Sequence, residues 1–298
     1  MGARAAQISR AARTVRTADG QTLHCDKLVL ATGSAPFVPP LPGRERADCF
    51  VCRTIKDLVA MQACGARSSS GVVVGGGLPG LECAKALRDV GLLTHVVEFA
   101  PRLMAAQVDE RGGRVLRHRI EAPGVQVHTQ KNTLEIVDGS AARQSMGFAD
   151  GSHLEADMIE FSAGSRQPPR DALARACGLA IGARGGIDTD SACRTSDADI
   201  DAIGECAAWN DKTFGLVAPG YQMARVVASQ LAGQDAAVLV GADMRTKLKL
   251  MGVDVAARPN PRWLWTRCPT AHSAAGATTS AKANSVLWWP MAPPPSLR

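Results

Sequence analysis

The sequence predicts an α/β protein with Rossmann-like dinucleotide-binding units, and one segment together with its sequel carries this prediction. In residues 71–80, Gly-Val-Val-Val-Gly-Gly-Gly-Leu-Pro-Gly, an apolar strand runs into the pattern Gly75-x-Gly77-x-x-Gly80. A helix-like run, a stop and a second apolar strand follow it. A strand, a glycine-rich turn and a helix in this order are typical of dinucleotide-binding folds.

The glycine-rich turn is the place where a pyrophosphate would bind. The turn opens a helix whose first backbone N–H groups and positive dipole end attract an anion. The expected helix, Leu81–Val90, stops at Gly91, and the second strand, Thr94–Glu98, ends in an acid. Glu98 lies 18 residues beyond Gly80, close to where a carboxylate grips the ribose hydroxyls of the adenosine.

The N-terminal segment predicts a β-hairpin. Ala6–Ser9 and Arg13–Thr17 have the pattern of strands, and the turn Asp19-Gly20 leads to a return strand at Thr22–Leu23. Asp-Gly between extended runs is a strong hairpin signal. Residues 1–17 also carry four arginines and no acid, as mitochondrial transit peptides do. We favour the hairpin.

The remaining elements alternate between strands and helices. Leu28–Leu30 is a buried strand that ends in Ala31-Thr32-Gly33-Ser34, and a proline-rich extended connector follows it. We further expect helices over 53–65, 107–121 and 221–231, strands over 125–129, 158–163 and 200–203, and two or three antiparallel strands with a turn at Asp150-Gly151. Residues 71–164 therefore predict a compact βαβ unit with an antiparallel meander.

Composition excludes two classes of partner. The net charge is +6, but residues 258–298 carry five basic residues and no acid, which leaves +1 for the rest of the chain. No basic face with interleaved aromatic residues marks a nucleic-acid site. No run of apolar residues is long enough for a membrane span. We therefore expect neither a nucleic acid nor a membrane as partner.

The cysteines and histidines predict no thiol or metal chemistry. Nine scattered cysteines, an odd number, fit the reducing cytoplasm better than a secreted disulfide framework. Cys49 and Cys52 have redox spacing, but the apolar residues between them indicate a strand, without a helix N-terminus to lower a thiol pKa. His95 and His128 are interpreted as ordinary strand residues, apart from any metal-ligand spacing.

Three strand ends complete the pattern of the chain. Thr32-Gly33 and Ala163-Gly164 are small turns that let a cofactor approach the backbone closely, and Gly204-Glu205 places an acid at another strand end. In this order, with the glycine-rich turn between them, these segments strongly resemble the two-dinucleotide flavoprotein reductases. In that family an NAD domain is inserted into an FAD domain, and hydride passes from the nicotinamide to the flavin.

The resemblance is closer to one branch, the FAD/NAD module of the assimilatory NAD(P)H nitrite reductase large subunit. It covers roughly residues 5–256, and its most specific segments are Gly215–Ala224 and Lys247–Val255. The resemblance implies two sets of cofactor-binding residues. Those for FAD are Thr32, Gly33, Arg53, Gly204, Glu205 and Gly220, and those for NAD(H) are Gly75, Gly77, Gly80, Glu98 and Gly164. The flavin would do the chemistry, so no catalytic acid or base is expected. Glu98 would repel a 2′-phosphate, which favours NADH over NADPH.

The resemblance also implies how the chain is divided. The expected parts are the first half of the FAD domain with its connector (1–66), the inserted NAD-binding domain (67–165), the second half of the FAD domain (166–236), the start of an interface domain (237–257) and a disordered or non-native tail (258–298). The tail has no sustained hydrophobic period, which a folded segment needs to bury one face.

Several departures from the family bear on function. The opening FAD fingerprint of the family, a βαβ unit, is missing before residue 1, and the iron–sulfur and sirohaem parts are missing after residue 257. Pro79 stands where the family usually has Leu, and Asp201 replaces an aromatic residue. We expect residues 71–164 to fold and bind NADH while flavin is not retained.

The leading interpretation is the electron-entry module of a nitrite reductase large subunit. It would pass hydride from NAD(P)H to FAD and electrons onward to an acceptor domain or subunit in the cytoplasm; a homodimer stays open. One alternative is a rubredoxin- or ferredoxin-reductase-like flavoprotein, which shares the glycine motifs. The other is a non-catalytic remnant that at most binds a nucleotide.

Overall fold

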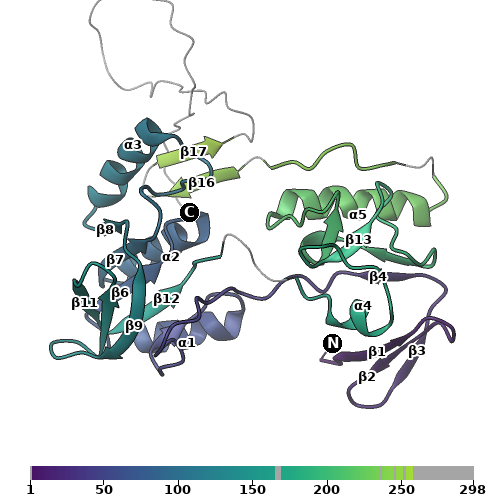
Figure 1. Cartoon of the computed structure of the whole chain (residues 1–298), viewed down its shortest axis with the longest axis horizontal. Helices are drawn as coiled ribbons and strands as arrows, with labels where there is room; N and C mark the ends of the chain where they lie inside the picture. The colour runs from purple at the N-terminus through teal and green to yellow at the C-terminus, as the bar shows by residue number, and fades with distance from the viewer. Residues whose placement is uncertain (1, 165–168, 235–236, 245, 251–252, 258–298) are drawn as a thin grey trace, which may run out of the picture. The chain divides into compact units, whose positions relative to one another are not determined.

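The chain forms two compact units in the computed structural model (Figure 1), which describes residues 2–164, 169–234, 237–244, 246–250 and 253–257. Unit 1 contains the described residues of 1–35 and 166–244, and unit 2 contains those of 36–165 and 245–298. The predicted tail lies outside the described residues. The segment 36–66, which the sequence assigns to the FAD domain and its connector, packs within unit 2.

Unit 2 is built on a parallel sheet of five strands. In spatial order they are β5 (Cys49–Phe50), β12 (Met158–Phe161), β6 (Ser70–Val74), β7 (Leu93–Glu98) and β8 (Gln126–Thr129). The connection from β6 leads to one neighbour, β7, while β12 lies on the other side. A parallel sheet whose strand order reverses at one point binds ligands at the carboxyl ends of the strands there.

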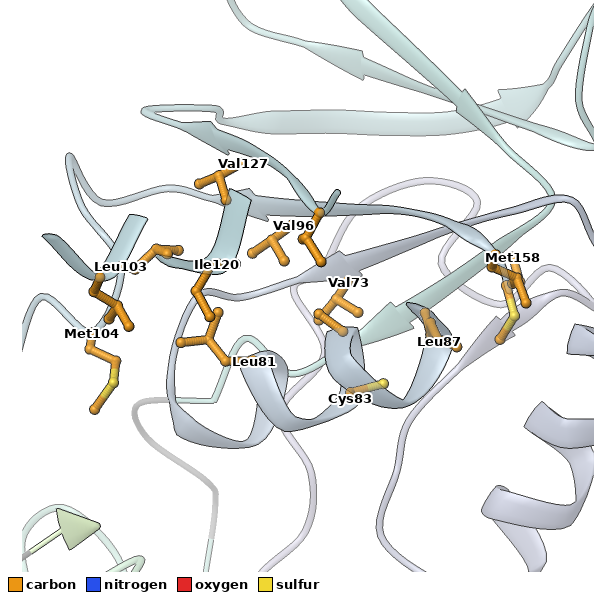
Figure 2. Packing of buried hydrophobic residues seen from close by; sticks show 14 of the residues in the cluster. Val73, Leu81, Cys83, Leu87, Val96, Leu103, Met104, Ile120, Val127 and Met158 are labelled. Atoms are coloured by element: carbon orange, nitrogen blue, oxygen red, sulfur yellow. The ribbon is translucent and has the colours of Figure 1, made fainter. Parts of the chain in front are cut away.

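Helices cover one face of this sheet and an antiparallel meander covers the other. The helices are α1 (Ile55–Gly65), α2 (Leu78–Asp89) and α3 (Glu110–Glu121), and the meander consists of β9 (Thr133–Asp138), β10 (Gln144–Phe148) and β11 (His153–Ala156). Val73, Val96 and Met158 pack on the helical side with Leu81 and Leu87 of α2 (Figure 2). The alternate strand residues face the meander, so both faces of the sheet are buried.

Unit 1 has smaller sheets. One is an antiparallel sheet of three strands, β1 (Ala5–Ser9), β2 (Thr14–Thr17) and β3 (Thr22–His24). The others are two parallel pairs, formed by β4 (Leu28–Leu30), β13 (Ile187–Thr189), β14 (Ile200–Ala202) and β15 (Ala207–Trp209). The helices of this unit are α4 (Ala172–Ala176), the 3₁₀ helix η1 (Gly204–Cys206) and α5 (Val217–Leu231). β4 pairs with β14, and β13 pairs with β15. Two further strands, β16 (Thr246–Leu250) and β17 (Val253–Ala257), form an antiparallel pair in unit 2.

The predicted elements are present, with shifted ends. The N-terminal hairpin is confirmed, because β1, β2 and β3 pair in antiparallel register around the turn at Asp19-Gly20. Helices α2 and α5 begin at Leu78 and Val217, earlier than expected. A proline lies in the first turn of each helix. A helix tolerates proline there because the backbone N–H groups of the first turn have no intrahelical partner, so the N–H that proline lacks is not missed.

Candidate functional site

The fingerprint turn connects β6 to α2 in a strained backbone conformation. Gly75 has φ 122°, which favours glycine, and its N–H donates to the Val97 carbonyl at 2.8 Å. The carboxyl ends of β6, β7 and β12 lie side by side because the three strands are parallel neighbours. Glu98 ends β7, and Ser162, Ala163 and Gly164 follow β12, so these residues gather at the same edge of the sheet as the turn.

Gly80 and Gly77 of the fingerprint differ in what surrounds them. A Cβ on Gly80 would lie 2.0 Å from the Gly75 carbonyl oxygen and 3.2 Å from Ser162 Cβ. Gly80 is therefore required for the close packing of helix on strand. A Cβ on Gly77 would meet no atom within 4 Å. The fold does not need glycine at position 77, and its open side is space that a ligand can occupy.

The N-terminus of α2 is prepared for an anion. Thr54 caps α1 with a capping box, and the Asp109 carboxylate caps α3 by accepting from the Gly112 N–H at 2.7 Å. Gly77 is the N-cap residue of α2, and it provides no side-chain cap. The backbone N–H groups of a first helical turn have no partner inside the helix, so an uncapped turn attracts a phosphate. Pro79 removes one of those donors.

Glu98 clamps two loops at this edge. Its Oε2 accepts a hydrogen bond from the Gly76 N–H at 2.6 Å, and its Oε1 accepts one from the Ala100 N–H at 2.7 Å. Each carboxylate oxygen can accept more than one bond, so ribose hydroxyls can still be accepted. The sequence analysis did not single out Gly76, although a Cβ there would lie 2.6 Å from Leu103 Cδ2.

A buried acid at the same edge was missed by the sequence analysis. Glu160 lies in β12 and is 0% exposed to solvent. The Ser162 hydroxyl donates a hydrogen bond to Oε1 of Glu160 at 2.9 Å. Burial raises the pKa of the Glu160 carboxyl to about 7. The apolar residues around it, Met158, Ile159 and Phe161, led the segment to be interpreted as an apolar strand. The charged residue inside it was the available signal.

In unit 1 the predicted FAD residues surround a group of strand ends. Gly33 after β4 and Gly204 after β14 have φ values of 70° and 75°, and Gly220 of α5 has a Cβ position only 3.5 Å from Gly204 Cα. The Ser34 hydroxyl donates to the Glu205 carboxylate at 2.7 Å, and the Thr32 hydroxyl donates to the carbonyl of Arg170. The structure thus brings together five of the predicted residues, Thr32, Gly33, Gly204, Glu205 and Gly220.

Arg53, the sixth predicted FAD residue, belongs to unit 2. It precedes the cap of α1, and its backbone N–H donates to the Asp57 carboxylate at 3.1 Å. Its role toward FAD stays a prediction, as do the roles of the other site residues.

The thiols and histidines have neighbours that oppose reactivity. Burial raises the pKa of the Cys49 thiol to about 11 and also raises that of Cys52, which disfavours a reactive thiolate. His95 and His128 lie in strands, β7 and β8, as the sequence predicts. They lie on adjacent strands, with Nδ1 of His95 and Nε2 of His128 3.2 Å apart. Within the described ranges no cluster of three or more His, Cys, Asp or Glu side chains has the arrangement of a metal site.

A comparison with protein-family models identifies the family of the chain. The model described as pyridine nucleotide-disulphide oxidoreductase matches residues 1–232. The chain belongs to this family. Among helices that the structure describes, none is long and apolar enough to cross a bilayer.

The similar proteins are reductases. The chain is 56% identical over 256 residues to the nitrite reductase (NADH) large subunit of Escherichia coli, covering 86% of this chain and 30% of the relative. It is 59% identical over 251 residues to the nitrite reductase [NAD(P)H] large subunit of Klebsiella oxytoca, covering 84% and 26%. The chain thus spans less than a third of these relatives.

Solved structures support the fold. A ferredoxin reductase from Rhodopseudomonas palustris superposes with a TM-score of 0.78 at 28% identity, covering 86% of this chain and 63% of that one. A NAD-dependent persulfide reductase from A. fulgidus superposes with a TM-score of 0.78 at 27% identity, covering 85% of this chain and 48% of that one. The predicted α/β Rossmann-like reductase fold is confirmed.

Proposed function

We propose that this chain is the electron-entry module of an NAD(P)H nitrite reductase large subunit, which takes hydride from NADH and passes it to FAD. The observation that carries the proposal is the uncapped, glycine-lined start of α2 beside Glu98 at the switch point of a parallel sheet. The identity of 56–59% to nitrite reductase large subunits supports that branch over a ferredoxin reductase, since the ferredoxin reductase from Rhodopseudomonas palustris is 28% identical.

The residues of unit 2 fit NADH. The pyrophosphate would take the N–H groups of the first turn of α2, and Gly77 leaves space for it. The Glu98 carboxylate would accept hydrogen bonds from the adenosine ribose, and it would repel a 2′-phosphate, which favours NADH over NADPH. Gly164 after β12 would let the nicotinamide half approach the backbone. These residues bind and orient the dinucleotide; none of them is required as an acid or base.

The residues of unit 1 fit FAD in part. Gly33, Gly204 and Gly220 leave backbone accessible at strand ends, and the carboxylate of Glu205 can accept hydrogen bonds from polyol hydroxyls. In the described part of this unit, no glycine-rich turn links a strand to a helix in the manner of Gly75–Gly80 in unit 2. FAD, when bound, supplies the hydride-accepting chemistry. Its electrons would continue to an acceptor domain or subunit, and the free cysteines fit a reducing cytoplasm.

A glycine variant tests the nucleotide site. Gly77→Ala places a methyl group in open space, so the fold should stay intact while NADH affinity falls at least about tenfold, since the methyl occupies the pyrophosphate position. The measurement is NADH fluorescence titration together with urea unfolding. Unchanged NADH affinity in a folded Gly77→Ala protein would contradict the proposed site.

The flavin part is tested by NADH-dependent dye reduction with added FAD. We expect reduction in the unmodified chain, and in Gly77→Ala we expect it to need an NADH concentration at least about tenfold higher. A ferredoxin-reductase-like activity predicts reduction of a small iron–sulfur protein by the chain. Absence of any dye reduction, with NADH still bound, would leave the nucleotide-binding remnant as the function.

A further inference from the structure

Glu160 is a charged residue where the fold calls for an apolar one. In β12 it is aligned with Val73 of β6, so both side chains face the helical side of the sheet. Its neighbours on the strand are buried hydrophobic residues, Met158, Ile159 and Phe161. No packing requirement of a parallel sheet explains an acid at a central position, because such strands are buried on both faces.

The carboxyl group is only partly satisfied. The Ser162 hydroxyl donates to Oε1, while within the described part of the chain Oε2 has no hydrogen-bond partner. Within the described residues, the titratable groups that face it are two thiols, Cys83 of α2 and Cys52 after β5. Burial raises the pKa of both thiols, so both are neutral at neutral pH. The Cys83 thiol and the Cys52 backbone N–H approach the carboxyl as neutral donors, so neither brings a positive charge to balance a carboxylate.

Glu160 lies directly beneath the fingerprint turn. Its strand partner Val73 precedes Gly75 by two residues, which is about 7 Å along a strand. Ser162, which hydrogen-bonds to Glu160, also packs against the turn: a Cβ on Gly75 would lie 2.5 Å from the Ser162 carbonyl oxygen. The Glu160 carboxyl therefore lies between the strand and α2, on the inner side of the turn that would receive a pyrophosphate.

We propose that Glu160 makes dinucleotide binding at the fingerprint turn proton-linked: the neutral carboxyl permits the pyrophosphate to bind, and the carboxylate repels it. This inference rests on the proposed NADH site. A carboxylate and a phosphate that lie on opposite sides of one packed turn repel each other, and we expect this repulsion to weaken binding by about tenfold or more. Because binding and protonation are linked, the bound dinucleotide also favours the protonated acid by the same factor.

The linkage has a definite direction. The carboxyl is raised to a pKa of about 7, so it is mostly neutral below neutral pH and mostly ionised above it. Affinity should therefore fall as pH rises through about 7, and binding near that pH should take up a proton. Glu160 acts here as an affinity-setting residue, not as a catalytic one.

The test is NADH affinity of the full chain, measured by fluorescence between about pH 6 and about pH 8. Three proteins are compared: the unmodified chain, Glu160→Gln, and the control Glu135→Gln, whose acid is exposed on β9 of the meander. We expect a fall of about fivefold to about tenfold in the unmodified chain and the control, and none in Glu160→Gln. ADP-ribose, which lacks the nicotinamide, should give the same pattern because it keeps the pyrophosphate.

The outcomes separate the two proposals. The same slope in Glu160→Gln as in the unmodified chain overturns the linkage and leaves the NADH site intact. No binding of NADH by any variant at any pH overturns the proposed function and the linkage with it. If Glu160→Gln does not fold, calorimetric titration of the unmodified chain in two buffers of different ionisation enthalpy decides: proton uptake near pH 7 supports the linkage, and its absence overturns it.

Discussion

The replacement Glu160→Gln should make unit 2 more stable, and increasingly so as pH rises. The glutamine keeps the size and one acceptor of the buried side chain but cannot ionise. The Glu160 carboxyl has a pKa of about 7 in the folded protein, against an ordinary value of 4.5. Below pH 4.5 the acid is protonated in both folded and unfolded chains, and the variant should differ little from the unmodified protein.

The magnitude follows from the two pKa values. Between pH 4.5 and about 7 the unfolded chain is ionised at Glu160 while the folded chain still holds the proton, so stability falls as pH rises. The difference between the folded and unfolded pKa values corresponds to a loss of about 3 kcal/mol in the free energy of unfolding, which is complete above pH 7. We therefore expect Glu160→Gln to exceed the unmodified protein by about 3 kcal/mol at about pH 8, and by close to zero at about pH 4.

A second group in unit 2 opposes this slope in the unmodified protein. Burial, with the neighbouring His128, lowers the pKa of the His95 imidazole from 6.5 to about 4. The unfolded chain is protonated there below pH 6.5, so stability rises with pH from about 4 to 6.5, by about 3 kcal/mol. The two contributions nearly cancel over this range. Only the comparison of variants separates them.

The assay is urea unfolding of the full chain at several pH values, with peptide-resolved hydrogen exchange to assign the transition to unit 2. The quantity of interest is the stability difference between Glu160→Gln and the unmodified protein, in which the His95 contribution cancels. A difference that stays constant from about pH 4 to about pH 8 would refute the reasoning, because the acid would then titrate alike in both states.

Three further results are expected. Gly80→Ala should lower the stability of unit 2 by about 3 kcal/mol or more, because its Cβ would lie 2.0 Å from a backbone oxygen. Urea unfolding compares it with Gly77→Ala, and equal stability of the two variants would contradict this expectation. Glu98→Gln should reduce the preference for NADH over NADPH by about tenfold, measured as the ratio of the two dissociation constants, and an unchanged ratio would argue against contact with the ribose. The purified chain should show no flavin absorption band, and stoichiometric FAD would sink the expectation that flavin is not retained.

Local patterns predicted the elements because their causes are local. The turn Asp19-Gly20 specifies a hairpin whatever surrounds it, and the strands β1 to β3 follow. The helix starts were less accurate because proline in a first turn, as at Pro79 and Pro219, is compatible with a helix that begins before it or after it. Parallel strands carry no such local marker of their partners, so the order of the five strands was not predicted and is known from the structure.

Contacts between distant segments could not be predicted from spacing. His95 and His128 are 33 residues apart and meet because β7 and β8 align Val97 with His128. The fingerprint pattern likewise gave Gly77 and Gly80 the same weight. Only the surroundings of each Cβ position distinguish the glycine that the fold requires from the one that leaves space for a ligand.

Two acids at one edge of the sheet place opposite demands on the site. Glu98 helps as a carboxylate, because it accepts the N–H groups of Gly76 and Ala100 and can accept a ribose. Glu160 helps only as a neutral acid, because its charge would lie beneath the pyrophosphate and no cation faces it in the part of the chain that the structure describes. Replacing Glu98 should therefore weaken binding at every pH, whereas replacing Glu160 should strengthen binding only above about pH 7. That difference in pH profile distinguishes a ligand-contacting acid from a charge buried behind the site.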